Sequence, residues 1–91
     1  MPVSLSLPTV LARLADGQRT LDAPAGTVRD VLSDVSRRFP ALAPRLLDDK
    51  GEVYPFVTFY LNDEDIRFAG GLGADVRDGD EVTVVSAVAG G

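Results

Sequence analysis

Hydrophobic and polar residues alternate near both ends of the chain. Residues 3–7 read Val-Ser-Leu-Ser-Leu, and residues 81–88 read Glu-Val-Thr-Val-Val-Ser-Ala-Val. Alternation with a period of two places the apolar side chains on one face of a strand. The pattern therefore predicts a half-buried strand over 3–7 and a final strand over 81–88.

A second extended segment is expected soon after the first. The Asp-Gly dipeptide at 16–17 favours a turn. After this turn, Leu21 is expected to share one face of an extended segment with Arg19 and Ala23. Pro8 has no N–H to donate. Either the first strand ends there, or it continues past a bulge at the edge of the sheet. The first third of the chain is therefore predicted to be a β-hairpin.

Helical periodicity replaces alternation in the middle of the chain. Thr27 is a suitable N-cap, and Asp30 stands three residues later in a position like that of a capping box. An apolar stripe at helical spacing comprises Val28, Val31, Leu32, Val35 and Phe39. Pro40 marks the end of this helix. Residues 41–47 are expected to add a short helical turn.

The second half of the chain again reads as strands. Residues 56–61, Phe-Val-Thr-Phe-Tyr-Leu, are the richest run of β-forming residues and predict a strand with both faces partly buried. Residues 62–65 reverse the chain, and 66–68 is expected to pair back as a short strand. Because the final strand can lie parallel beside the first, this order fits one sheet wrapped around one helix.

The expected architecture is therefore an α+β fold of the β-grasp (ubiquitin-like) type. It comprises a mixed sheet of about four to five strands packed on one main helix. A chain of 91 residues can build one core but not two, so residues 1–91 are expected to form a single domain. Within it, residues 87–91 are expected to be a flexible C-terminal tail.

Composition restricts the chemistry that the side chains can perform. The chain has no cysteine and no histidine, which excludes disulfides, thiolate metal sites and the commonest general base. A net charge of −5 disfavours nucleic acid and anionic membranes and favours a partner with a basic face. The sequence shows neither a signal peptide nor an apolar stretch long enough to span a membrane. A cytoplasmic protein is expected.

Other candidate sites in the sequence are better explained as turns. The acidic groups at 48–49, 63–65 and 78–80 lack the spacing of a calcium loop, and turns require these same residue types. The glycine-rich segment 70–73 matches no phosphate-binding motif. We therefore expect no metal site and interpret 70–73 as a bend after a short strand.

Three aromatic residues in the second half differ in their expected roles. Phe59 lies within the richest strand pattern and is expected in the core. Tyr60 and Phe68 fit either the core or an exposed position, where an aromatic side chain can anchor a partner.

The last residues, AVAGG at 87–91, pose a separate question. A terminal Gly-Gly packs poorly, because glycine has no side chain and loses much entropy on ordering. The segment is either a frayed end or a functional one. Two glycines can thread a narrow channel and present an α-carboxylate, and no charged side chain follows Glu81, so the tail can enter a confined site without burying a charge.

Two segments carry a family resemblance. Residues 62–71 read NDEDIRFAGG, and the chain ends in AVAGG. Together with the element order and the Asp-Gly-Asp turn at 78–80, these segments resemble the MoaD/ThiS family of ubiquitin-like small sulfur carriers over essentially the whole chain. They are most similar to members that serve cysteine biosynthesis.

The resemblance implies that Gly91 is the residue that is covalently modified. Gly90 would be the narrow residue before it, and Val88 and Ala89 would connect both glycines to the folded domain. In the family, an adenylyltransferase/sulfurtransferase related to ubiquitin-activating enzymes uses ATP to activate the terminal carboxylate, which then becomes a thiocarboxylate. The chain itself would be a carrier rather than an enzyme, with no cofactor of its own.

The resemblance also implies further partners. In cysteine biosynthesis they are a pyridoxal phosphate-dependent cysteine synthase, which receives the sulfur, and a zinc metalloprotease, which releases cysteine. The alternatives are a MoaD-like small subunit of molybdopterin synthase, a sulfur carrier for thiamine or a secondary metabolite, and a non-catalytic β-grasp interaction module.

Overall fold

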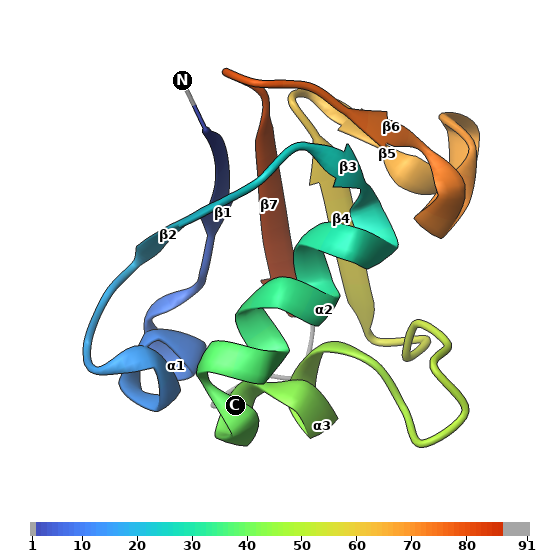
Figure 1. Cartoon of the computed structure of the whole chain (residues 1–91). Coiled ribbons are helices and arrows are strands. Elements are labelled where there is room, and N and C mark those ends of the chain that lie inside the picture. Colours follow the sequence, from blue (N-terminus) through green and yellow to red (C-terminus); the bar gives the residue numbers. More distant parts are fainter. Residues whose placement is uncertain (1, 87–91) are drawn as a thin grey trace.

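A computed structural model describes residues 2–86 of the chain. One five-stranded sheet has the order β2-β1-β7-β4-β5, and the helix α2 crosses one of its faces (Figure 1). The strands of this sheet are β1 (Val3–Ser6), β2 (Thr20–Ala23), β4 (Val57–Leu61), β5 (Glu64–Asp65) and β7 (Glu81–Ser86). The expected β-grasp fold, a mixed sheet on one main helix, is confirmed.

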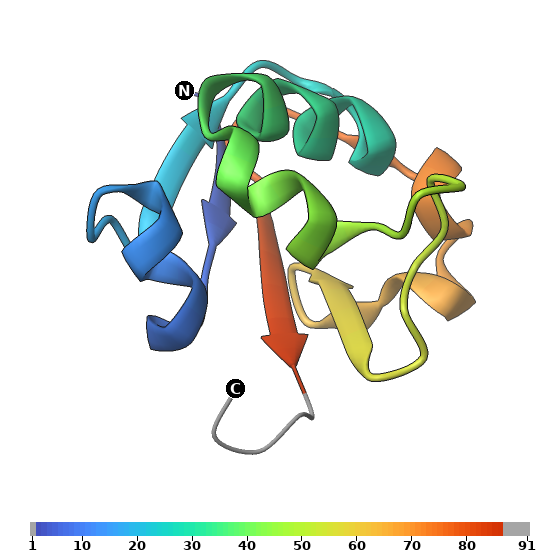
Figure 2. The ribbon, with the colours of Figure 1, turned by 90° about the horizontal axis from the view of Figure 1, so that it is seen from below.

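The strand β7 lies in the middle of the sheet, between β1 and β4 (Figure 2). It runs parallel to β1, with Ser4 opposite Glu81 and Ser6 opposite Thr83. It runs antiparallel to β4, with Val57 opposite Ser86. The parallel pairing of the first and last strands is thus as predicted. Residues 87 and 88, which the alternation assigned to the final strand, lie outside the described residues.

The pairing of β1 with β2 is antiparallel as predicted, but the connection between them is not a simple hairpin turn. It contains α1 (Thr9–Ala12) and a 3₁₀ turn at Arg13–Ala15. Pro8 ends the strand, and its carbonyl accepts hydrogen bonds from the N–H groups of Leu11 and Ala12. The face expected for β2 holds for Leu21 and Ala23, which are buried, but Arg19 is exposed.

The main helix, α2 (Val28–Arg38), begins where the sequence predicts. The Thr27 hydroxyl accepts the backbone N–H of Asp30 at 3.1 Å, and the Asp30 carboxylate accepts the N–H of Thr27 at 3.0 Å. This capping box satisfies backbone donors that the first turn leaves without helical partners. A 3₁₀ turn at Pro40–Leu42 and the short helix α3 (Ala43–Leu46) follow, as expected.

The segment after β4 departs from the expectation. Residues 66–68 form a 3₁₀ turn, and the strand that pairs back with β4 is β5, two residues earlier. The Asp65 carboxylate accepts the N–H of Arg67 at 2.9 Å, and this side-chain cap begins the 3₁₀ turn. A two-stranded pair of β3 (Gly26–Thr27) and β6 (Asp75–Val76) was not anticipated, because two residues are too few to show a period.

One hydrophobic core lies between α2 and the sheet. The predicted stripe residues Val28, Val31, Leu32 and Val35 are fully buried in it, while Phe39 packs against it half-buried. Phe59 is 1% exposed, which confirms its expected place. Leu42 and Leu46 show that the segment after α2 closes one end of the same core. Among residues 2–86, no helix is both long and apolar enough to cross a membrane.

Replacing Leu32 tests how much the α2 contact contributes to stability. Leu32→Ala removes a fully buried side chain and leaves a cavity between helix and sheet. We expect the free energy of unfolding to fall by about 2–5 kcal/mol. Urea denaturation followed by circular dichroism measures it. Ser33→Ala, at the exposed neighbouring position, is the matched control and should change stability by less than about 0.5 kcal/mol. Equal losses would contradict the assignment of the buried face.

The capping box predicts a pH dependence of stability. The hydrogen bonds from Thr27 hold the pKa of Asp30 below its ordinary value of 3.8. A lowered pKa in the folded state stabilises the protein above the unfolded-state pKa, and this contribution is lost as the pH falls through the folded-state pKa. The urea concentration at the unfolding midpoint should therefore fall less for Asp30→Asn than for the natural chain between about pH 6 and pH 3. Asp49→Asn, in an exposed turn, should behave like the natural chain.

Candidate functional site

The predicted site residues Val88, Ala89, Gly90 and Gly91 lie outside the described residues, but the strand that leads to them is described. Along β7, Val82 and Val84 are buried on the α2 side, whereas Val85 is exposed. Ser86 is the last described residue, and it lies opposite Val57 of β4. The candidate site is therefore the surface around the end of β7.

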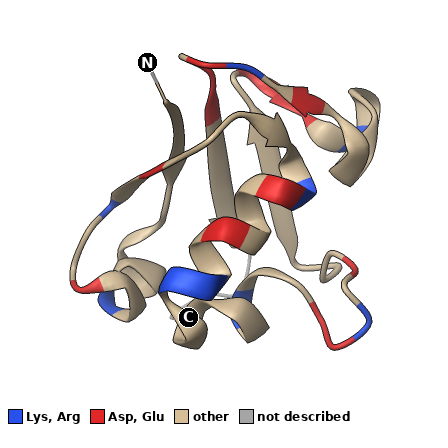
Figure 3. Cartoon of the chain, in the orientation of Figure 1, with Lys and Arg blue, Asp and Glu red and all other residues tan. Residues whose placement is uncertain are grey.

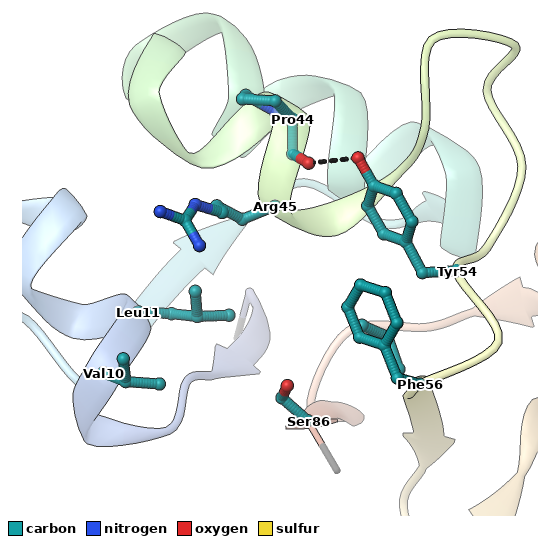
Figure 4. A pocket seen from close by; sticks show the side chains of 8 residues that line it. Val10, Leu11, Pro44, Arg45, Tyr54, Phe56 and Ser86 are labelled. Carbon is teal, nitrogen blue, oxygen red and sulfur yellow. Dashed lines mark hydrogen bonds between the residues drawn. The ribbon is translucent and has the colours of Figure 1, made fainter. Parts of the chain in front are cut away.

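A pocket of about 350 Å³ opens beside the end of β7 (Figure 4). It forms because β1 ends at Ser6, opposite Thr83, and the chain then turns at Pro8 into α1. The end of β7 thus faces α1 on one side and the segment leading into β4 on the other. The residues lining the pocket are Val10, Leu11, Pro44, Arg45, Tyr54, Phe56, Val57 and Ser86.

Two aromatic rings form one wall of this pocket. Tyr54 and Phe56 stack with ring centroids 5.0 Å apart and planes 16° from parallel. The Tyr54 hydroxyl donates a hydrogen bond to the carbonyl of Pro44, which ties the segment before β4 to α3 (Figure 4). Phe56 remains 42% exposed and Val10 36% exposed. The rim of the pocket therefore presents apolar surface to solvent.

Among the described residues that line the pocket, Arg45 is the only charged one. It is exposed, extends from α3 over the pocket, and takes part in none of the ion pairs within the described part of the chain (Figure 4). On β7, only Glu81, at the opposite end of the strand, is charged (Figure 3). The end of β7 thus combines an apolar pocket with a single cation.

The NDEDIRF segment lies at the other end of β7 and has a structural role there. Asn62 adopts a positive φ of 56°, and its backbone N–H donates to the Glu81 carbonyl at 2.7 Å. Its side-chain oxygen accepts the N–H of Glu81 at 3.0 Å, and its side-chain nitrogen donates to Asp80 at 3.3 Å. Three hydrogen bonds of Asn62 therefore hold the start of β7 in place.

Asp80 adds a further hydrogen bond at the start of β7. Its carboxylate accepts the backbone N–H of Arg77 at 3.0 Å, in the turn before β7. This hydrogen bond, with the one from Asn62, lowers the pKa of Asp80, so the carboxylate stays ionised in the fold. In the acidic turn at 78–80, Asp80 therefore stabilises the backbone of the turn.

Asp65 and Arg67 form a second polar pair in the same segment. The guanidinium donates from Nη2 to the carboxylate at 2.6 Å and from Nε at 3.1 Å. These bonds lower the pKa of Asp65 and raise that of Arg67. Arg67 also lies over the ring of Phe68, which is 78% exposed and so outside the core. Tyr60, the other aromatic left open, is half-buried on β4.

In the acidic group at 48–49, Asp48 also has backbone partners. Asp48 accepts the N–H groups of Lys50 and Glu52 at 2.8 and 2.9 Å. Within residues 2–86, no group of three or more His, Cys, Asp and Glu residues is placed to hold a metal ion. Asp48, Asp65 and Asp80 thus each bind the backbone of a turn.

The sequence did not reveal the pocket. Its walls come from α1, α3, the segment before β4 and the end of β7, which are far apart in the chain. The Tyr54-Pro55-Phe56 sequence, with one residue between two aromatics, is a signal that could have pointed to it. That spacing does not reveal that α1 and α3 lie opposite.

Comparison with known proteins places this geometry in a family. A family model described as the ThiS family matches residues 5–91. The sulfur carrier protein CysO of Mycobacterium tuberculosis is 42% identical over 93 aligned residues, which cover 100% of both chains.

Solved structures agree with the sequence comparison. CysO in the BexX/CysO complex of Amycolatopsis orientalis superposes with a TM-score of 0.89 at 40% identity, over 98% of this chain and 99% of that one. SAMP1 from Haloferax volcanii superposes with a TM-score of 0.82 at 31% identity, over 100% of both chains.

These similarities support a sulfur carrier role, and the curated relatives are named as carriers and modifiers rather than as catalysts. The residues matched by the family model include the NDEDIRF segment and the residues that line the pocket at the end of β7. The chain belongs to the ThiS family.

Proposed function

We propose that this protein carries sulfur as a thiocarboxylate on Gly91 and donates it for cysteine biosynthesis. The observation that carries the proposal is the 42% identity to CysO over the full length of both chains. The Gly-Gly sequence at 90–91, which three residues separate from the end of the central strand at Ser86, supports the same chemistry.

The proposed chemistry begins at the α-carboxylate of Gly91. A free carboxylate is a poor acyl donor because resonance stabilises it. In the proposed activation, a carboxylate oxygen attacks the α-phosphorus of ATP on the activating enzyme, and pyrophosphate leaves. A sulfide-level donor then attacks the acyl carbon, a C–S bond forms, and the C–O bond to AMP breaks. The glycyl thiocarboxylate remains on the carrier.

The chain's own residues present the carboxylate rather than react with it. β7 is hydrogen-bonded on both sides in the sheet, so it is a rigid support for the tail. Gly90 and Gly91 have no side chains to obstruct a narrow active site. Because no charged residue follows Glu81, the tail can enter a partner without desolvating a charged side chain.

The proposed partners are an adenylyltransferase/sulfurtransferase that uses ATP, a pyridoxal phosphate-dependent cysteine synthase and a zinc metalloprotease. The synthase accepts the sulfur, and the metalloprotease releases cysteine from the carrier. We propose no cofactor bound by the chain itself. A net charge of −5 favours basic docking faces on these enzymes.

A second acceptor is favoured by one observation. The CysO of Amycolatopsis orientalis was solved in a complex with BexX. That CysO therefore binds BexX as a partner. A carrier that serves another sulfur-inserting pathway is therefore the alternative. Affinity purification of the natural chain from its own cells separates the two: a cysteine synthase and a metalloprotease support the first proposal, whereas other enzymes alone support the second.

Intact-mass spectrometry tests the carrier function directly. Incubation with the activating enzyme, ATP and a sulfide source should increase the mass by the difference between sulfur and oxygen. Deletion of Gly91 should abolish the increase while leaving the circular dichroism spectrum unchanged, because the described core ends before the tail. No increase under conditions that modify a known carrier would refute the proposal.

Extending the chain tests whether the carboxylate must be on Gly91. Adding Ser-Ala after Gly91 moves the free carboxylate away from the glycine pair. We expect thiocarboxylate formation to be lost and the unfolding midpoint to stay unchanged. A non-catalytic interaction module predicts the opposite, namely that the extended protein keeps its function.

A further inference from the structure

We propose that this protein associates head to tail, with Phe68 of one copy inserted into the pocket beside the end of β7 of the next copy. Arg45 on the rim of that pocket then faces Asp63 and Glu64, which precede Phe68 in the chain. Association of this kind depends on residues of the folded domain and does not rest on the proposed function.

Phe68 is the most exposed large apolar side chain among residues 2–86, at 78%. It stands at the end of the 3₁₀ turn 66–68, in which Ile66 is buried and holds the turn to the core. Because a 3₁₀ helix has three residues per turn, Phe68 points away from the direction of Ile66. Arg67 lies over its ring, 5.9 Å from the centroid, and is itself paired with Asp65. The ring is therefore an apolar projection that another protein can remove from water.

The pocket beside the end of β7 has the size and the lining that a phenyl ring needs. Its volume of about 350 Å³ stands at the small end of the range for ligand pockets, which suits one large side chain. The stacked rings of Tyr54 and Phe56 form one wall (Figure 4). An incoming ring can pack against them in an offset or edge-to-face arrangement. Val10 and Phe56 are partly exposed at the rim and become covered by the inserted residue.

Phe68 does not fill the pocket of its own chain. It is not among the residues that line the pocket. It follows β5 at one edge of the sheet, whereas the pocket lies at the end of the central strand β7 (Figure 1). The ring must therefore come from a second molecule. A contact between two different surfaces is heterologous, so each added copy leaves one Phe68 and one pocket unused at the ends.

Charge favours the same pairing. Arg45 on α3 takes part in none of the ion pairs within residues 2–86, and neither do the exposed residues Asp63 and Glu64 at β5 (Figure 3). The acidic residues nearest to Arg45 in the sequence, at 48–49, adjoin a separate hollow. Complementary charges at two surfaces attract and also fix their orientation. A chain with a net charge of −5 can therefore still associate through this one pair of surfaces.

The contact is small, and the association is expected to be weak. It covers one phenyl ring and the rim around it, well below the area of a stable interface. We expect a Kd on the order of 0.1–1 mM. Because the contact covers Val10 and Phe56 beside Ser86, association competes with any protein that docks at the end of β7.

Sedimentation equilibrium of the full chain tests the association. Between about 20 µM and about 2 mM, on either side of the expected Kd, the weight-average mass should rise past that of two copies. Phe68→Ser should stay monomeric. Val85→Ser is the matched control, because Val85 is 44% exposed but does not line the pocket, and it should associate like the natural chain. A constant mass for the natural chain, or undiminished association of Phe68→Ser, would overturn the proposal.

Mixing two defective variants tests which surfaces meet. Phe68→Ser keeps the pocket, whereas Val10→Asp keeps Phe68 and places a carboxylate at the pocket rim. Each variant alone should be monomeric. The equimolar mixture should form dimers and nothing larger, since one chain supplies only the ring and the other only the pocket. A mixture that stays monomeric at concentrations where the natural chain associates would refute the pairing of Phe68 with this pocket.

Charge reversal tests the contact of Arg45 with the acidic pair. Arg45→Glu alone and Glu64→Arg alone each place like charges opposite one another, and each should raise the Kd about three- to tenfold. The double variant should recover most of the loss. Arg19→Glu is the control, because Arg19 is exposed and does not line the pocket, and it should leave the Kd unchanged. A double variant that associates no better than the single ones would contradict the proposed orientation.

Discussion

The structure depends on the hydrogen bonding of β7 to two neighbours at once. Its first residues pair with β1 and its whole length pairs with β4, so the last strand of the chain is the centre of the sheet. Its buried valines contribute to the contact with α2. A strand held in this way cannot fray without opening the core, and the residues that follow it therefore leave from a fixed point.

The two ends of β7 have different environments, and each suits a different task. At its start, Asn62 and Asp80 bind the backbone and hold the turn before the strand in place. At its end, the neighbouring β1 has already turned away at Pro8, which leaves an apolar pocket with Arg45 beside it. Side-chain hydrogen bonds to the backbone thus gather at the start of β7, and exposed apolar surface lies at its end.

The sequence resemblance rested on NDEDIRF and AVAGG, and the structure separates their roles. NDEDIRF folds into hydrogen bonds that organise turns, so its similarity to other family members reports the fold. AVAGG is the segment to which we assign the proposed sulfur chemistry. Under the proposed function, this separation explains how a chain without histidine or cysteine can serve a reaction: its folded part supplies a support, and the proposed reacting group is on the main chain.

The amino-acid sequence by itself determined the local features: the alternating strands, the α2 stripe with its capping box, and the carboxylate candidate at Gly91. These depend on neighbouring residues, which periodicity and capping rules describe. It did not reveal the helix between β1 and β2, the 3₁₀ turn at 66–68 or the two-residue pair β3–β6, since those segments are too short to show a period. Only the tertiary structure decided the pocket, because α1, α3 and Tyr54–Phe56 meet through packing between segments distant in the chain.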